Sequence, residues 1–171
     1  MKIRGYKLAR RHAPVLAQVE ASAEQAATLV REQMRERLGT LEIVVTDRAG
    51  MEDTVQRAHE DLLGGRSLER HYRYADAVCG CTTIGPNGVL IVINAKACGT
   101  DRRETAITLV HELVHGVQYS RAKATGDAVR ALHNNYRITA LSNRDAQRMN
   151  RQVDADEREA KRLEWLARKI R

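Results

Sequence analysis

The chain has 171 residues with 29 Lys and Arg against 22 Asp and Glu, so its formal net charge is +7, and 43% of its residues are hydrophobic. This composition is typical of one globular domain and excludes disordered and collagen-like chains. No apolar run approaches the ~20 residues of a membrane span, and three cysteines are too few for a disulfide scaffold. We therefore expect a single domain over residues 1–171 in a reducing cytoplasm, with no membrane partner.

The first part of the chain is expected to form a helix, a strand and a second helix. Pro14 suits the first turn of a helix, and apolar residues then recur at steps of three and four, which predicts a helix over 14–38. The short β-branched run at 41–45 predicts a strand. Residues 52–63 are expected to form the second helix, which the following pair of glycines would end.

A β-hairpin is expected next. Residues 74–84 and 89–94 flank the sequence Gly85-Pro86-Asn87-Gly88, which is a strong turn signal. Pairing of these strands would bring the cysteines of the chain near one another, as free thiols, a second metal site or a redox switch. These cysteines are Cys79, Cys81 and Cys98.

Two helices and a loop should follow the hairpin. Asp101 and Glu104 form a start like a capping box for a helix that runs to about Ser120. Thr125-Gly126 indicates a loop, and residues 134–141 are expected to form a short helix.

The last segment has the clearest period. Apolar residues and one acid, Asp156, alternate at steps of three and four from residue 146 to residue 170, which predicts a long C-terminal helix over 145–171. Apart from the short helix at 134–141, the expected order is therefore α-β-α-β-β-α-α. This order predicts an α+β fold with a small mixed or antiparallel sheet.

Positive charge is concentrated at the two ends of the chain. Residues 1–40 carry 8 basic and 4 acidic groups and residues 121–171 carry 13 and 7, whereas residues 41–120 carry 8 and 11. Basic ends suit a polyanion such as DNA, because binding releases the counterions of its phosphates. A solvated surface without a partner is the alternative, and with one Trp, five Tyr and no Phe the chain has few rings to stack on single-stranded bases.

The sequence His111-Glu112-Leu113-Val114-His115 carries the strongest chemical signal. Side chains four residues apart on a helix lie on one face, so both imidazoles can bind one metal ion. Zinc lowers the pKa of the water it binds and polarises a carbonyl, and Glu112 can act beside it as the general base. The pattern therefore indicates one catalytic Zn²⁺.

A catalytic zinc needs a third protein ligand and an open position. The metzincin pattern is excluded, because its histidine would fall at Arg121 and its glycine at Gln118. The remaining candidates are His133 and two acids of the last helix, which are Asp156 and Glu157; an acidic third ligand is typical of gluzincins. Asp156 in an apolar stripe needs an Arg partner, a bond to a zinc-bound histidine or the metal itself, because an unpaired buried carboxylate is costly.

These residues resemble the SprT-like domain, a family of zinc metallopeptidases of the zincin type. The likeness is carried by Thr108-Leu109-Val110 ahead of the first motif and by His133-Asn134 with Tyr136 two residues further on, and it spans about residues 74–142. It implies that the two histidines of the motif and His133 bind zinc and that the glutamate between them is catalytic. The family also implies proteolysis linked to DNA, with which the basic ends are compatible.

Together these inferences predict a zinc-dependent endopeptidase that hydrolyses peptide bonds in a protein or peptide substrate. Glu112 would activate water and later protonate the leaving amine, and the strand at 89–94 would pair with an extended substrate. The hydroxyl of Tyr119 or Tyr136 is a candidate donor to the oxyanion. Two alternatives stay open: a basic nucleic-acid-binding module with a structural zinc, and an interaction protein that uses the long C-terminal helix.

Overall fold

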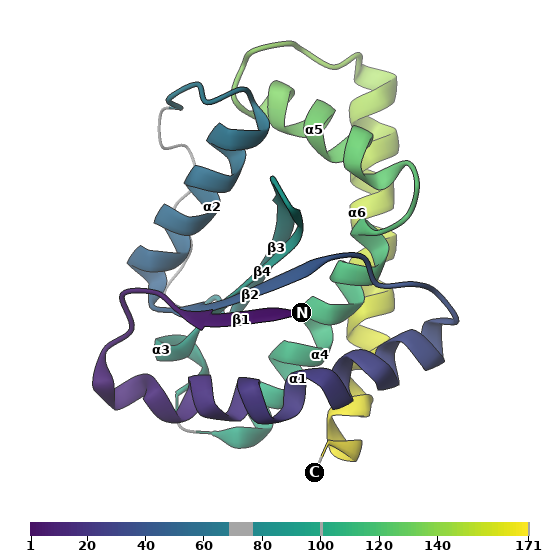
Figure 1. The fold of residues 1–171 in the computed structure, drawn as a ribbon. Coiled ribbons are helices and arrows are strands. Elements are labelled where there is room, and N and C mark those ends of the chain that lie inside the picture. Colours follow the sequence, from purple (N-terminus) through teal and green to yellow (C-terminus); the bar gives the residue numbers. More distant parts are fainter. Residues whose placement is uncertain (69–76, 100, 171) are drawn as a thin grey trace.

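The computed structural model describes residues 1–68, 77–99 and 101–170. A mixed four-stranded sheet lies at its centre, in the order β1-β2-β4-β3 (Figure 1). β1, β2 and β4 are parallel, and β3 runs antiparallel to β4 as the second member of a hairpin. The strands are β1 (Lys2–Gly5), β2 (Leu41–Thr46), β3 (Gly80–Gly85) and β4 (Gly88–Asn94).

Helices cover both faces of this sheet. Side chains of β2 and β4 alternate between the faces, so that Ile43 and Ile91 enter a large core with α1 and α4, whereas Val44 and Val92 enter a smaller core under α2. Burial on both faces explains why these two strands are continuously apolar. The helices are α1 (Ala13–Met34), α2 (Arg48–Leu62), α3 (Ala95–Cys98), α4 (Arg102–Tyr119), α5 (Ala124–Asn135) and α6 (Asn143–Leu163), with the 3-10 helices η1 (Arg10–His12) and η2 (Glu164–Lys169).

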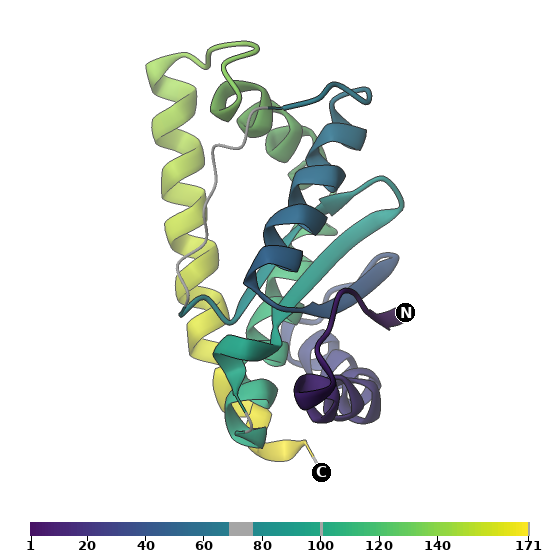
Figure 2. The same ribbon diagram turned by 90° about the vertical axis from the view of Figure 1, so that its left-hand side faces the viewer.

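The long helix α6 stands along one side of the molecule and carries α5 at its upper end (Figure 2). Its C-terminal end is anchored in the large core through Ala160 and Leu163, and η2 adds Leu166. Its N-terminal half is held to α5 by ion pairs, among them Arg148 with Asp127 at 3.3 Å. α5 and α6 therefore form an arm beside α4, in which α6 packs into the core at its C-terminal end and is joined to α5 by ion pairs at its N-terminal end.

The expected α+β class is confirmed. The helices expected over 14–38 and 145–171 end earlier, at Met34 and Leu163, and the second continues as the 3-10 helix η2. α2 begins four residues earlier than expected because Asp47 caps it, accepting a hydrogen bond from the Gly50 amide at 2.8 Å. β1 and α3 were not expected at all: they are only four residues long, too short for a periodic signal. Residues 74–76 of the predicted hairpin lie outside the described residues.

Three expectations are wrong. Thr125-Gly126 belongs to α5 rather than to a loop, because a glycine in a first helical turn costs only about 1 kcal/mol and ion pairs hold this helix to α6. The helix expected at 134–141 ends at residue 135, where the amides of Ile138 and Thr139 both turn back to the His133 carbonyl. The strand at 89–94 is also no edge: β4 lies between β2 and β3, and β3 is the edge strand on this side of the sheet.

Candidate metal centre

Helix α4 presents the two histidines of the motif on one face and buries the other in the large core. Asp101 caps its first turn by accepting from the Arg103 amide at 2.8 Å. Leu109, Leu113 and Val117 are fully buried against the sheet and α1. The helix is therefore fixed along its length, and its imidazoles project from a rigid element.

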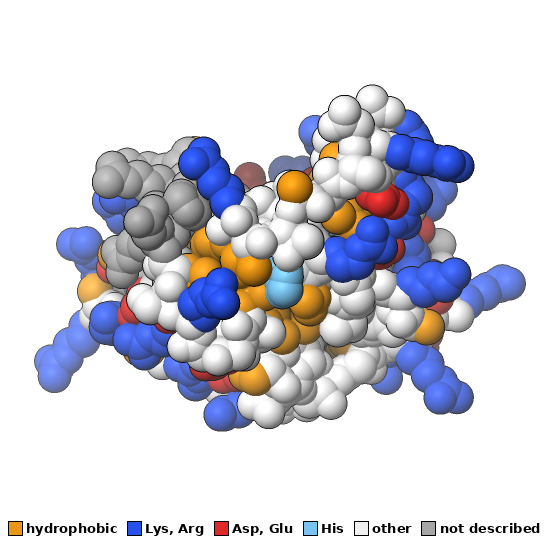
Figure 3. All heavy atoms as spheres, turned by 90° about the horizontal axis from the view of Figure 1, so that it is seen from above, with side chains coloured by type: hydrophobic (Ala, Val, Ile, Leu, Met, Phe, Trp, Pro, Cys, Tyr) orange, Lys and Arg blue, Asp and Glu red, His pale blue; other side chains and the backbone are white. Residues whose placement is uncertain are grey.

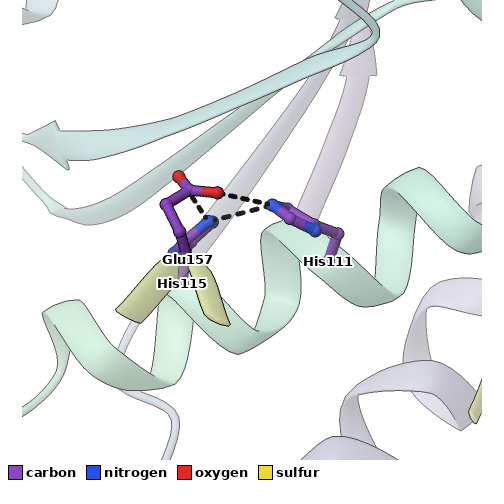
Figure 4. Close-up of side chains that lie close together, drawn as sticks. All are labelled: His111, His115 and Glu157. Atoms are coloured by element: carbon purple, nitrogen blue, oxygen red, sulfur yellow. Dashed lines mark hydrogen bonds and ion pairs between the residues drawn. The ribbon is translucent and has the colours of Figure 1, made fainter. Parts of the chain in front are cut away.

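The two imidazoles converge on each other and on a carboxylate from α6. The Nε2 atoms of His111 and His115 lie 3.1 Å apart. The Glu157 carboxylate approaches from α6, with Oε2 at 3.6 Å from His111 Nε2 and Oε1 at 3.4 Å from His115 Nε2 (Figure 4). Ligand atoms of all three residues lie within 4.8 Å of one another.

The outer nitrogen of each imidazole is held by an acceptor. His111 Nδ1 lies 3.0 Å from the Glu164 carboxylate, which can only accept. His115 Nδ1 lies 2.7 Å from Gln118 Oε1, and the orientation of this amide is set by its nitrogen, which donates to the Asp156 carbonyl and to Glu159 at 3.0 Å each. Protons on both Nδ1 atoms leave both Nε2 lone pairs directed at the point where Glu157 also arrives.

This donor set fits a divalent metal ion. Two Nε2 lone pairs and a carboxylate that face one another repel, and a cation between them reverses the sign of the interaction. Two imidazoles and one carboxylate are the ligands of a known class of catalytic zinc site, and acceptors on the far nitrogens orient such imidazoles and strengthen them as ligands.

Glu112 lies beside this group but points toward the sheet. Its side chain is buried, and Thr82 Oγ1 in β3 lies 2.7 Å from its Oε2 and 3.1 Å from its backbone carbonyl. Burial raises the pKa of Glu112 to about 7, against the lowering effects of the Thr82 hydrogen bond and of His115. A carboxyl group with a pKa near neutrality can both take up and release a proton at physiological pH.

A cleft of about 500 Å³ opens over the histidines and Glu112. Its floor is formed by α4 and by the start of β3, and its walls come from α5 and α6, with Ala128, Met149 and Val153 among the apolar residues. Seen from above, hydrophobic side chains gather at the centre of the molecule and Lys and Arg project around its periphery (Figure 3). A volume of about 500 Å³ is large enough for several residues of an extended chain.

The structure brings Glu157, and not His133, to the two histidines. His133 lies in the last turn of α5 and is absent from the metal-ligating group found among the described residues. Of the candidates for a third ligand, the acidic residue Glu157 therefore has the required position beside the two histidines. Asp156 takes the structural role considered for it, because its carboxylate accepts from Gln152 at 2.9 Å and lies 3.5 Å from Arg121.

Four supporting residues were missed by the sequence analysis: Gly80, Thr82, Gln118 and Glu164. The sequence spacing of two of them could have indicated their position. Gln118 follows His111 by seven residues and His115 by three, which places it on the face of α4 that carries the motif. Glu164 follows Glu157 by seven residues, two helical turns further along one face. Gly80 and Thr82 come from a different element, and no spacing connects them to Glu112.

The candidate tyrosines differ in whether they line the cleft. Tyr119 lines it, and burial raises the pKa of its hydroxyl to about 12, so the group stays protonated as a donor. Tyr136 is buried elsewhere, with its hydroxyl 2.9 Å from His59 Nδ1.

The three cysteines are free thiols. Cys81 lines the cleft. Burial raises the pKa of the Cys98 thiol to about 12, and the neighbouring Cys79 makes a smaller contribution in the same direction.

No protein-family model, curated protein or solved structure matches this chain. The resemblance to the SprT-like domain therefore depends only on the residues quoted for it, and of these His133 lies outside the metal-ligating group. Within the described residues, no helix combines the length and the apolar character needed to cross a membrane.

Proposed function

We propose that the protein is a zinc-dependent peptidase of the zincin type with an acidic third ligand. His111, His115 and Glu157 would hold the ion, and Glu112 would be the general base. The observation that carries the proposal is the convergence of the two Nε2 atoms on Glu157 while Glu164 and Gln118 accept from the two Nδ1 atoms. Three ligands in the described residues correspond to a catalytic zinc, whereas a structural site is closed by four.

When bound, zinc would supply a Lewis acid that polarises the scissile carbonyl and acidifies water. The remaining steps belong to side chains. Glu112 takes a proton from the attacking water and delivers it to the leaving amine, which its pKa of about 7 permits in both directions. Thr82 and the buried setting keep this carboxyl group in one orientation. Tyr119, at the cleft wall, is the available donor to a developing oxyanion.

The edge strand β3 suits the binding of an extended peptide. Its inner side pairs with β4, and no strand of the described residues pairs with its outer side. Gly80, Cys81 and Thr82 of this strand line the cleft beside Glu112. A substrate paired to this edge through backbone hydrogen bonds would run past the general base, which favours peptide bonds as the scissile groups.

The interaction-protein alternative is less well supported. Its partner would dock on the apolar stripe of the C-terminal helix, but the C-terminal part of that stripe is buried inside the molecule. Ala160, Leu163 and Leu166 are buried in the large core. Val153 is the one large hydrophobic residue of α6 that is exposed, and it lies at the cleft.

Metal analysis and a casein assay test the proposal. The purified protein should contain about one zinc per chain and hydrolyse casein, and the assay run with and without DNA measures whether DNA stimulates hydrolysis. Glu112→Gln should lower activity by about 10²- to 10⁴-fold and retain zinc. Glu104→Gln, on the exposed first turn of the same helix, is the matched control and should leave both unchanged. Full activity in Glu112→Gln, or a protein that takes up no zinc, contradicts the proposal.

A further inference from the structure

A second hollow lies at the opposite end of α6 from α5. It is a groove of about 900 Å³ between α1, the first turns of α4, the end of α6 and η2. The C-terminal end of the chain lies beside α1 here (Figure 1), and Gln25 of α1 donates to the Lys169 carbonyl at 3.1 Å. The groove thus joins two of the segments that make the ends of the chain basic, although they are far apart in sequence.

The rim of this groove carries positive charges without partners. Of the residues that line it, Arg102, Arg103, Lys161 and Arg168 are exposed and form no ion pair within the described part of the chain. Arg162 reaches only Glu159, at 4.0 Å. These cations repel one another, so an anion that enters the groove is stabilised by all of them.

The groove contains one acidic residue, and that residue is already engaged. Glu164 lines the groove but holds His111 Nδ1 at 3.0 Å. Because the Glu164 carboxylate is bound to a histidine of the metal centre, the excess of positive charge at the rim remains. The groove is also lined by small apolar residues such as Ala17, Ala21 and Ala106, together with Ile107.

The single tryptophan of the chain also lies in this groove. Trp165 is 42% exposed, one of three large hydrophobic residues that are exposed in the described structure. Lys169 Nζ lies over its ring, 4.7 Å from the centre, which places a further cation on one face of the indole. An exposed indole among unpaired arginines offers a flat apolar surface next to anion-binding groups.

We propose that this groove binds single-stranded nucleic acid. Guanidinium groups bind phosphates through two parallel hydrogen bonds, and an indole stacks on a base of any sequence. A duplex hides its base faces, so it would leave Trp165 without a partner. An acidic peptide would satisfy the rim but has no flat ring for the indole. DNA and RNA single strands share the chemistry that the groove recognises.

Trp165 gives the binding experiment a built-in reporter. Its fluorescence is the only tryptophan signal of the protein, so quenching by an added oligonucleotide reports on this groove alone. Titration with oligomers of ~10 thymidines and ~10 uridines should quench it, and the two arms distinguish DNA from RNA. If the four unpaired cations each contact a phosphate, the logarithm of affinity should fall against the logarithm of salt with a slope of about −3.

Variants separate stacking from charge, with binding measured by the anisotropy of a labelled oligonucleotide. Trp165→Ala should weaken binding by about 5- to 150-fold, and Trp165→Phe should restore part of the loss. Arg102→Gln with Arg103→Gln should reduce the salt slope by about 1.4. The control pair Arg144→Gln with Arg151→Gln removes two exposed charges from the upper part of α6 and should change the slope little.

Several outcomes overturn the inference. Equal affinity for a duplex or for polyglutamate, no quenching of Trp165, or equal effects of the groove pair and the control pair would each do so. Circular dichroism of every variant establishes that the fold is kept. The inference is independent of the proposed peptidase activity, because binding needs no hydrolysis and Glu112→Gln protein should bind oligonucleotides as well as the parent.

Discussion

Gly80 and Glu112 fit together so closely that any side chain at position 80 would displace the Glu112 carboxyl group. A β-carbon at position 80 would lie 2.5 Å from Glu112 Oε1 and 2.8 Å from its carboxyl carbon. The first residue of β3 thus leaves the space that the carboxyl group of α4 occupies. The strand that borders the cleft and the proposed general base are therefore positioned by one contact.

Replacing Gly80 by alanine should displace the Glu112 carboxyl group and leave the metal ligands in place. A displacement of about 1 Å in a reacting group costs on the order of 10²-fold in rate, so we expect a fall in kcat of that size at unchanged zinc content. Gly85→Ala is the matched control, because a β-carbon at the other end of β3 meets its neighbours only at 3.5 Å and beyond. Full activity in Gly80→Ala would show that the position of Glu112 does not matter for hydrolysis.

Thr82 should set the pH at which activity appears. Its hydroxyl hydrogen bond lowers the pKa of Glu112, which burial raises. Thr82→Val removes this bond, so the pKa of Glu112 rises, the base is ionised only at higher pH, and the acid limb of the kcat profile moves upward. Thr82→Ser keeps the hydroxyl and should restore the parent profile. An acid limb that is identical in Thr82→Val would show that the hydroxyl does not act on the ionised base.

The third ligand can be identified by the size of the loss in zinc affinity. Glu157→Gln removes a ligand atom and should weaken zinc binding by more than 10²-fold. Glu164→Gln removes only the acceptor of His111 Nδ1 and should cost about 10- to 100-fold. His133→Asn should change little, because His133 lies outside the group. Competition with a chromogenic chelator measures all three, and a loss in His133→Asn as large as that in Glu157→Gln would restore the histidine as ligand.

The histidine pair was predictable from sequence because one helix carries both residues, and helical spacing alone places them on a common face. The third ligand was not, since Glu157 reaches the pair only through the packing of α6 on α4. Asp156 and Glu159 of α6 contact Arg121, and Ala160 and Leu163 enter the large core. This packing decides which acid faces the histidines. Asp156 and Glu157 are neighbours in sequence, yet Asp156 lies 3.5 Å from Arg121 while Glu157 meets the imidazoles.

In the fold, too, features set by local residue types were predictable and those set by distant contacts were not. The hairpin and the capped start of α4 follow from local residue types, so the sequence analysis placed both. β1 pairs with a distant strand, β2, as in the register of Lys2 with Glu42, and Arg4 and Glu42 add an ion pair at 2.7 Å. A four-residue strand whose only support is this distant pairing leaves no periodic signal. For that reason the sheet has one more strand than expected, whereas the strand at 89–94 is internal because β2 and β3 pair with its two sides.

His59 should make the stability of the fold depend on pH. It is a buried residue in the last turn of α2, with Nδ1 at 2.9 Å from the Tyr136 hydroxyl and Nε2 at 3.0 Å from Thr83 Oγ1. Burial lowers the pKa of His59 to about 4, against about 6.5 in an unfolded chain. Above pH 6.5 the imidazole is neutral in both states and the full stability is present.

Between pH 6.5 and 4 the unfolded chain binds a proton at this histidine that the folded protein does not, so the free energy of unfolding should fall by up to about 3 kcal/mol as the pH is lowered through this window. Urea unfolding of the parent and of His59→Gln at a series of pH values measures the effect, and the difference between the two proteins removes the contributions of all other groups. The dependence should be flatter in His59→Gln by that amount, whereas His12→Gln, in η1 near the surface, should keep the parent dependence. Parallel curves for the parent and His59→Gln would mean that this imidazole accepts a proton without leaving its buried site.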